Sequence, residues 1–427
     1  MDILERTKRL AQSAEIYTRQ EKKIHVHFEG RNLQNIQADY DYGRALRIFK
    51  DGRIGFAHTT QEGIDHDKAL VKRALAVAPY GQVASFTMSQ KASILNTHQL
   101  YQAPKELETE DVVKIANDTL DSLYEKHHQF GWSVIARYQQ GHIHLANTEG
   151  FDGQYNYTRL VLIISGLYMQ KNDILHYHKQ WNGNQYPDTL NTFITSTDRD
   201  LQKVDRLIDV NPGTYQVIFS PSATSLLLHT LIVPITGKNL INRTPHMIDA
   251  RMTLIDDPTS SNGSQVIPFD DEGVITRSKV LFKEGLFVEG IHSLATAKAV
   301  GHQPTGNGFR TSYAKIPKPK ITNLFLSPGN QSITDIIANI KNGLYIIMLG
   351  GTINSDFQNC HLVGTVSLGY RIVNGECVGR IKNVTVNLDG PSVLKEQVIA
   401  VSSEREWVNS SLLPAIVIER VFIGTLS

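Results

Sequence analysis

A single histidine, His229, stands where a metal-binding helix could begin, in the stretch SLLLHTLIVPITGKN. A zinc peptidase helix follows its first histidine with a glutamate and supplies a second histidine about one turn later, so that the imidazoles hold the ion and the carboxylate activates water. Here Thr230 follows His229, and Pro234 occupies the place of the second histidine. These residues alone leave two interpretations open: the remains of a metal site, or a histidine on a core helix that ends near Pro234 and Gly237.

Three histidine pairs offer another possible metal chemistry. On a strand, residues two apart lie on the same face, so both rings of each pair could meet one ion. A third ligand and supporting hydrogen bonds would still be needed. We favour solvent-facing positions on a half-buried sheet for all three, namely His25 and His27, His142 and His144, and His176 and His178.

Two acidic groups could hold a hard cation or share a proton, Asp256-Asp257 and Asp270-Asp271-Glu272. Loop solvation and turn chemistry explain them as well, and we favour that structural interpretation. Cys360 and His361 are adjacent, but neighbours on a strand point to opposite faces, which disfavours a nucleophile and its base. The sequence also lacks the Walker, GxGxxG and GxSxG signatures of phosphate binding and serine hydrolysis.

The composition is that of an ordinary globular protein. The 427 residues include 43 Lys and Arg and 42 Asp and Glu, which gives a formal net charge of +1. This balance disfavours binding to nucleic acid through its phosphates. The first residues lack the apolar run of a signal peptide and no apolar run is long enough to span a bilayer, so we expect a cytoplasmic protein without a membrane partner. The two cysteines, Cys360 and Cys377, are expected to be free thiols.

The elements that must position these residues divide the chain into two parts. An amphipathic helix is predicted over residues 1–20, strands follow with a hairpin at Asp51-Gly52, and helices are predicted over 65–78 and 106–126. Further strands precede a helical segment that extends to residue 208. The turn cluster VNPG then suggests a boundary, so we predict an N-terminal α+β domain over 1–208 and a C-terminal β-rich domain over 209–427.

The second part is mostly β. Pro221 and Ser222 open the helix that carries His229, and a helix over 332–343 is predicted to begin at Ser332 and end at Gly343. Hairpins are expected at Glu284-Gly285 and at Asn374-Gly375. The predicted fold class is α+β, with an antiparallel sheet and helices in the first domain and a curled sheet or partial barrel with a few helices in the second.

Four segments of the second half resemble the TldD/PmbA family of peptide-maturing metalloproteins, also described as modulators of DNA gyrase. These are PFDDEGVITRSKVLFKEGLF, TGNGFR, the residues from Asn323 to the helix before Gly343, and GYRIVNGE. The first half matches more loosely, through LRIFKDGRIGFAHTT and HLANTEGFDGQYNYTR. The resemblance covers almost the whole chain.

The family has two kinds of subunit. The catalytic kind resembles a zinc peptidase with H-E-x-x-x-H on a helix and a late cysteine ligand. In this chain His229 keeps the first position, Thr230 and Pro234 replace the glutamate and the second histidine, and no cysteine follows Cys377. The resemblance therefore implies the PmbA-like, or TldE-like, subunit without the zinc motif, with no catalytic residue and no metal of its own.

That resemblance implies a dimer around a peptide cavity. The partner would be a TldD-like catalytic chain that carries zinc, or a second copy of this chain, and the substrate an unfolded peptide. Asp271, Glu272, Asn307 and Arg310 are the candidate cavity residues, where Arg310 could bind a peptide carboxylate or tie two loops together.

Two other functions stay open in the sequence. The first is a stand-alone metallopeptidase that uses a rearranged set from His229, His246, His361 and the acidic loops. The second, more remote, is a regulator that binds gyrase or nucleic acid.

Overall fold

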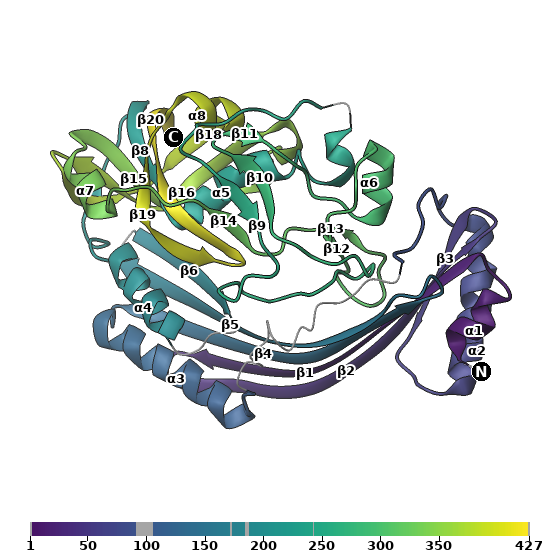
Figure 1. Cartoon of the computed structure of the whole chain (residues 1–427). Coiled ribbons are helices and arrows are strands. Elements are labelled where there is room, and N and C mark those ends of the chain that lie inside the picture. The colour runs from purple at the N-terminus through teal and green to yellow at the C-terminus, as the bar shows by residue number, and fades with distance from the viewer. Residues whose placement is uncertain (1, 91–105, 171–172, 184–187, 242, 426–427) are drawn as a thin grey trace.

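The computed structural model describes residues 2–90, 106–170, 173–183, 188–241 and 243–425. Two β-rich regions face each other: a long curved sheet from the first half and a second sheet, which includes a barrel, from the other half. Figure 1 shows the second region lying over the concave side of the curved sheet. The fold class is α+β, as the sequence predicts.

The first sheet has six strands, all antiparallel, in the order β3-β2-β1-β4-β5-β6. Several of these strands are much longer than the usual five or six residues, and twist accumulated over such lengths gives a curved sheet. The bounds are β1 Ser13–Glu29, β2 Asn32–Lys50, β3 Arg53–Thr59, β4 Phe130–Asn147, β5 Asp152–Gln170 and β6 Asp173–Gly183.

Helices cover this sheet at its two ends. Figure 1 shows α1 (Ile3–Lys8) and α2 (Ile64–Val77) beside β3, and α3 (Thr109–Lys126) and α4 (Asp188–Asp200) at the opposite end on the convex side. A short η1 helix (Ala78–Tyr80) follows α2. The α3 helix starts with a reciprocal capping box between Glu108 and Asp111, which satisfies backbone N–H groups that a helix start leaves unpaired.

The predicted first helix is much shorter than expected. It ends at Lys8, and β1 begins at Ser13. Residues 13–20 pair with β2 and in part with β4, because Ala14 and Ile16 then lie in the core between the sheet and α2. Tertiary pairing thus overrides the helical spacing of the apolar residues.

Five strands of the second region close into a barrel. Each pairs with the next in the order β8, β15, β16 and β18, and β20 pairs with both β18 and β8. Closure leaves no free edge within this ring. The bounds are β8 Gly213–Phe219, β15 Asn342–Gly350, β16 His361–Val373, β18 Val384–Asp389 and β20 Ser411–Thr425.

Shorter strands extend the second sheet beyond the barrel. They are β7 Leu207–Ile208, β9 Leu254–Asp256, β10 Lys279–Lys283, β11 Leu286–Phe287, β14 Leu324–Leu326, β17 Glu376–Ile381 and β19 Val398–Val408. A separate hairpin pairs β12 (Gly308–Phe309) with β13 (Lys318–Pro319). The helices of this half are α5 Pro221–Ile232, α6 Leu294–Val300, α7 Ile333–Ala338 and α8 Gly390–Glu396, with short turns η3 Gly237–Leu240, η4 Thr352–Asn354 and η5 Phe357–Asn359.

Three predicted hairpins are confirmed, each with positive φ at both central residues. This conformation suits Asn, Asp and Gly and matches the twist of the flanking strands. The pairs are Asp51-Gly52, Glu284-Gly285 and Asn374-Gly375. The helix predicted over 332–343 begins after its Ser332 cap as expected but ends at Ala338, and Gly343 lies inside β15, where its backbone pairs with β8 and β16.

Alternate residues of the barrel strands belong to two different cores. Val217 and Leu344 pack with α5 and the loops around it, whereas Ile218 and Tyr345 join the core that extends to α3, α4 and the first sheet. The core of the first sheet therefore continues into the barrel. The proposed division between residues 208 and 209 stays a prediction, and β7 at Leu207–Ile208 already pairs with β17 of the second sheet.

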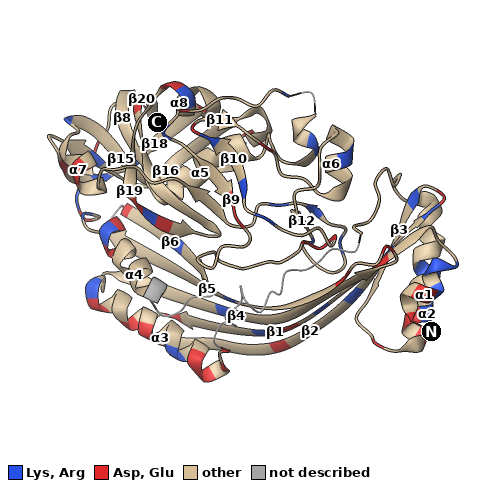
Figure 2. Cartoon of the chain, in the orientation of Figure 1, with Lys and Arg blue, Asp and Glu red and all other residues tan. Residues whose placement is uncertain are grey.

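Charges are dispersed over both regions in Figure 2, with Lys and Arg interspersed among Asp and Glu on the helices and strands. Within the described part of the chain, no helix is both long and apolar enough to cross a membrane.

Candidate functional site

The helix that carries His229 is a core helix. Ser220 caps α5 by accepting a hydrogen bond from the Ala223 N–H over 3.2 Å, and Pro221 stands in the first turn, where its missing N–H costs nothing. Most of its apolar side chains are buried against the barrel. A helix that is apolar on nearly all sides is buried in a large core.

The three motif positions have different environments. The His229 ring is exposed beside Phe357, with ring centroids 5.5 Å apart and nearly perpendicular planes, and desolvation there lowers the pKa of His229. Thr230 is fully buried, and its hydroxyl donates to the Leu227 carbonyl oxygen over 2.6 Å. Pro234 follows the helix and, with Thr230, lines a cavity of about 190 Å³.

A close contact with α8 fixes the surroundings of Thr230. A Cβ atom added to Gly390 would lie 1.8 Å from the Thr230 Oγ1 atom, so only glycine fits there without movement. Cys360 and His246 also line the small cavity. Burial raises the pKa of the Cys360 thiol, which keeps it protonated near neutral pH.

No metal cluster is formed by the histidines that the sequence singles out. Over the described ranges, no three His, Cys, Asp or Glu side chains are grouped so as to hold an ion. The histidine pairs of the first sheet instead contact polar side chains on neighbouring strands: His27 contacts Ser133, His142 contacts Asn156, His144 contacts Asp152 and His178 contacts Ser165.

The acidic segment before β10 is built into a turn. The carboxylate of Asp270 accepts from the N–H groups of Glu272 and Val274, each over 3.0 Å, and from that of Gly308 over 2.7 Å. Burial and the charge of Glu272 raise the pKa of Asp270, and the three N–H donors act in the opposite direction. Asp270 therefore joins its own turn to the TGNGFR segment.

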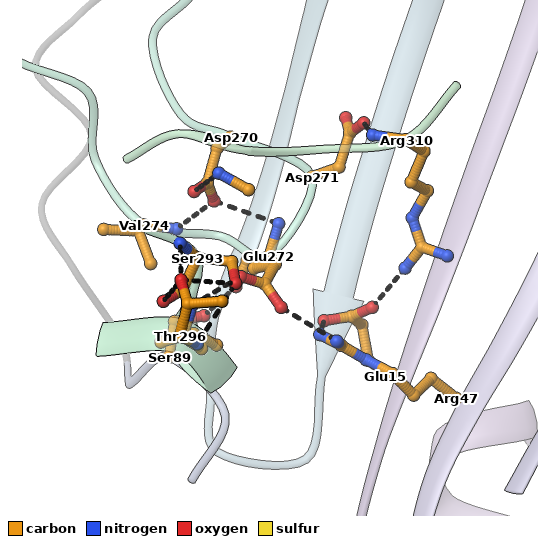
Figure 3. A network of polar contacts seen from close by, with 12 residues as sticks. Glu15, Arg47, Ser89, Asp270, Asp271, Glu272, Val274, Ser293, Thr296 and Arg310 are labelled. Atoms are coloured by element: carbon orange, nitrogen blue, oxygen red, sulfur yellow. Dashed lines mark hydrogen bonds and ion pairs between the residues drawn. The ribbon is translucent and has the colours of Figure 1, made fainter. Parts of the chain in front are cut away.

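Glu272 and Arg310 join this turn to the first sheet. Glu272 accepts from Arg47 of β2 over 2.9 Å, Arg47 also bonds Glu15 of β1 over 2.7 Å, and Glu15 accepts from Arg310 over 2.6 Å. Figure 3 shows this chain of alternating charges running from the turn to the strands. Each of the four side chains is at most 1% exposed, so the network is a buried link between the two halves.

Asp271 and Arg310 also line a larger cleft. The Asp271 carboxylate accepts from the Arg310 backbone N–H over 2.7 Å, and burial raises the pKa of Asp271 to about 6. The Arg310 guanidinium lies 4.7 Å from the Tyr17 ring centroid and also donates to the Lys315 carbonyl oxygen over 2.9 Å. Because its fork is occupied in this way, Arg310 ties a loop to the first sheet.

Asn307 is a buried scaffold residue. Its amide donates to Asp256 over 2.8 Å and to the Lys320 carbonyl oxygen over 2.9 Å, and its oxygen accepts from Thr305 over 2.9 Å. Asp256 is fully buried, accepts two hydrogen bonds from Thr322, and pairs with Lys279 at 3.2 Å. Asn307 thus positions the segment that carries Lys320 and does not line the cleft itself.

The cleft has a volume of about 480 Å³ and lies between the first sheet and loops of the second half. Ligand-binding pockets have volumes of this order. Its sequence-predicted members are Asp271 and Arg310. The residues that sequence reasoning missed come mainly from one face of β1 and β5, and include Tyr17, Arg19, Glu21, Lys23, Tyr157 and Arg159, opposite Lys320.

A sequence pattern could have found part of this wall. Tyr17, Arg19, Glu21 and Lys23 alternate along β1, and alternate residues of a strand lie on one face. The helix predicted over residues 1–20 does not bring out this alternation, because it includes Tyr17 and Arg19. Nothing in the sequence brings Lys320, some 300 residues away, to the same cleft.

Comparison with known proteins defines the class of this molecule. Residues 212–425 match the PmbA/TldA metallopeptidase C-terminal domain, and residues 14–78 match domain 1 of the PmbA/TldA metallopeptidases. The first match covers half of the chain. The chain belongs to the PmbA/TldA metallopeptidase family.

Individual relatives support this placement. The Haemophilus influenzae metalloprotease TldD homolog is 33% identical over 144 residues, which are 34% of this chain and 30% of that relative. The chain thus matches less than a third of that relative's length. The crystal structure of TldE from Thermococcus kodakarensis has a TM-score of 0.89 at 19% identity, with 99% of both chains covered. A Thermotoga maritima structure, described as a proposed modulator of a DNA gyrase, has a TM-score of 0.85 at 18% identity and 99% coverage of both chains.

Proposed function

We propose that this chain is the non-catalytic subunit of a peptide-cleaving or peptide-maturing complex, in which a TldD-like partner carries the zinc. The observation that carries the proposal is the state of α5. Its three motif positions offer one exposed imidazole, one hydroxyl bonded to its own helix and one proline. A catalytic zinc takes about three protein ligands and a water molecule.

The residues around α5 do not fit a zinc ion. Thr230 cannot act as a carboxylate base, and Pro234 has no donor atom. The alternative hypothesis draws a rearranged set from His229, His246, His361 and the acidic loops, and these residues form no three-ligand group in the described part of the chain. Zinc chemistry is therefore assigned to the partner.

A role in holding a peptide is supported by the cleft against the first sheet. Its volume suits a few residues of an extended chain, and its walls combine aromatic rings with charged side chains. We propose that the complex is a cytoplasmic heterodimer and that this chain forms one wall of the peptide cavity. A second copy of this chain is the other possible partner.

Zinc analysis and co-expression test this proposal. The purified chain alone is expected to hold far less than one zinc per chain and to cleave no peptide. Co-expression with a chain that carries H-E-x-x-x-H is expected to give a complex on sizing that contains zinc and digests unfolded peptides, and omission of this chain should abolish the digestion.

Opposite results would identify the alternative functions. One tightly bound zinc in the chain alone, with peptide hydrolysis that is lost on chelation and in His229→Ala, would establish a stand-alone metallopeptidase. Salt-dependent DNA binding at micromolar concentration or tighter would favour the nucleic-acid regulator instead.

A further inference from the structure

Cations outnumber anions in the cleft against the first sheet. Five basic residues line it, Arg19, Lys23, Arg159, Arg310 and Lys320, whereas Glu21 and Asp271 are its acidic residues. Charged groups that lose water are costly unless an opposite charge or hydrogen bonds replace it. A basic residue of the cleft that has no carboxylate partner therefore marks a place where a bound anion would be favourable.

Three of the five cations have carboxylate partners. Arg19 lies 3.3 Å from Asp41, Lys23 lies 3.0 Å from both Glu21 and Asp41, and Arg310 lies 2.6 Å from Glu15. The two acidic residues of the cleft are also engaged. Tyr157 donates to Glu21 over 2.6 Å, and the Arg310 N–H donates to Asp271.

Arg159 and Lys320 have no ion pair among the residues that the structure describes. The Nε atom of Arg159 is buried without a hydrogen-bond partner there, and Nη2 reaches only the neutral amide of Asn182, over 2.9 Å when that amide's oxygen faces the guanidinium. Lys320 is exposed on the opposite wall, so an anion in the cleft can reach it.

The two cations also act on each other. Partial desolvation and the charge of Arg159 lower the pKa of Lys320, whereas the charge of Asp271 raises it. Desolvation likewise lowers the pKa of Arg159. An anion that reaches both side chains would offset their mutual repulsion.

We propose that Arg159 and Lys320 form a carboxylate-binding site that holds an acidic group of the peptide, either its C-terminal carboxylate or an Asp or Glu side chain. Arg159 and Lys320 supply positive charge from opposite walls of the cleft, which suits a carboxylate that reaches both. Tyr157, Ile143 and Phe309 provide rings and apolar surface around them. This inference rests on the proposed function, because it names the chemistry that the peptide-holding cleft selects.

Peptide binding to the full chain tests the site. Three labelled peptides of one neutral sequence are compared by fluorescence anisotropy: one with a free C-terminus, one amidated, and one amidated with a single internal Glu. At least one acidic form is expected to bind about tenfold more tightly than the amidated neutral form, which corresponds to about 1.4 kcal/mol. Preference for the first assigns the C-terminus, and preference for the third assigns a side chain.

Charge-removing variants locate the site. Arg159→Gln and Lys320→Gln should each remove most of this preference, and Arg159→Lys should keep part of it. The matched controls are Arg137→Gln, an exposed residue on the neighbouring strand β4, and Lys318→Gln, two residues before Lys320 and outside the cleft lining. Both controls should bind all three peptides like the unaltered chain, and Lys320→Gln, at an exposed position, should fold normally.

The failures are distinguishable. Equal binding of all three peptides, unaffected by the variants, would overturn the carboxylate site and leave the peptide-holding function standing. A preference for acidic peptides that survives in Arg159→Gln and Lys320→Gln would also overturn the site. Absence of binding by every peptide would overturn the peptide-holding function and this inference together.

Discussion

At the scale of single residues, Thr230 and the candidate cavity residues show that some buried polar side chains only stabilise the fold, whereas others line the cleft. Thr230 satisfies its hydroxyl within α5 and needs neither a metal nor a substrate. Asn307 and Asp270 are polar residues buried to organise loops, with every contact directed at the protein itself. Asp271 differs, because it lines the cleft and carries a carboxylate that burial keeps from ionising at its usual pH.

The pKa of Asp271 predicts a pH-dependent stability. Burial raises that pKa from 3.8 to about 6, so the folded state binds the proton more tightly than the unfolded state does. The ionisation of Asp271 therefore does not reduce the free energy of unfolding below about pH 4. Above about pH 6 it reduces that free energy by its full amount, at most about 3 kcal/mol. Asp271→Asn should gain stability relative to the unaltered chain as pH rises from 4 to 7, as measured by urea unfolding.

A matched variant separates this effect from general charge removal. Asp65 is exposed on α2, where Asp65→Asn should shift stability little across the same pH range. A difference between Asp271→Asn and the unaltered chain that stays constant from pH 4 to 7 would contradict the assignment.

At the scale of elements, α5 and α8 show how tightly the helix that carries His229 is built into the core. The close approach of Gly390 to Thr230 predicts that Gly390→Ala lowers the free energy of unfolding by about 1–3 kcal/mol, the usual cost of overpacking. Thermal or urea unfolding measures this cost. Gly213→Ala is the control, because its added Cβ would meet its nearest neighbour at an ordinary 3.7 Å; equal losses in the two variants would contradict the tight contact.

The elements themselves were largely predictable from local sequence. Hairpins at Asp51-Gly52 and Asn374-Gly375 follow from turn chemistry, and the start of α5 follows from Pro221 and Ser222. The predicted length of the first helix was wrong because the pairing of residues 13–20 with β2 is a nonlocal effect. The cleft could be predicted only in part, since the placement of Arg159 and Lys320 in one cleft depends on how the two halves pack, which no local pattern contains.

At the scale of the whole molecule, the buried ionic network joins the two halves. Arg47 lies between Glu15 and Glu272, and both pairs are almost completely buried. Arg47→Met would leave two buried carboxylates without this partner, so we expect a loss of about 3–5 kcal/mol in the free energy of unfolding. Lys68→Met, which breaks an exposed ion pair on α2, should cost about 0.5 kcal/mol or less.

Denaturant unfolding of both variants measures these costs. A loss in Arg47→Met no larger than that in Lys68→Met would show that the network contributes no more than a surface pair.

The shared core predicts that the two halves unfold together. One continuous cluster contains Trp132 of the first sheet and Tyr370 of the barrel, and the ionic network adds a second connection across the same boundary. Separation of the halves would expose both apolar surfaces, so neither half gains by unfolding first. Trp407 fluorescence in a Trp132→Phe/Trp181→Phe variant reports on the second half, and fluorescence of Trp132 and Trp181 in Trp407→Phe reports on the first sheet. In each variant the thermal midpoint by fluorescence should equal the thermal midpoint of the same variant by circular dichroism. A first-sheet transition clearly below the transition that Trp407 of β19 reports would instead establish two independent folding units that meet near residue 208.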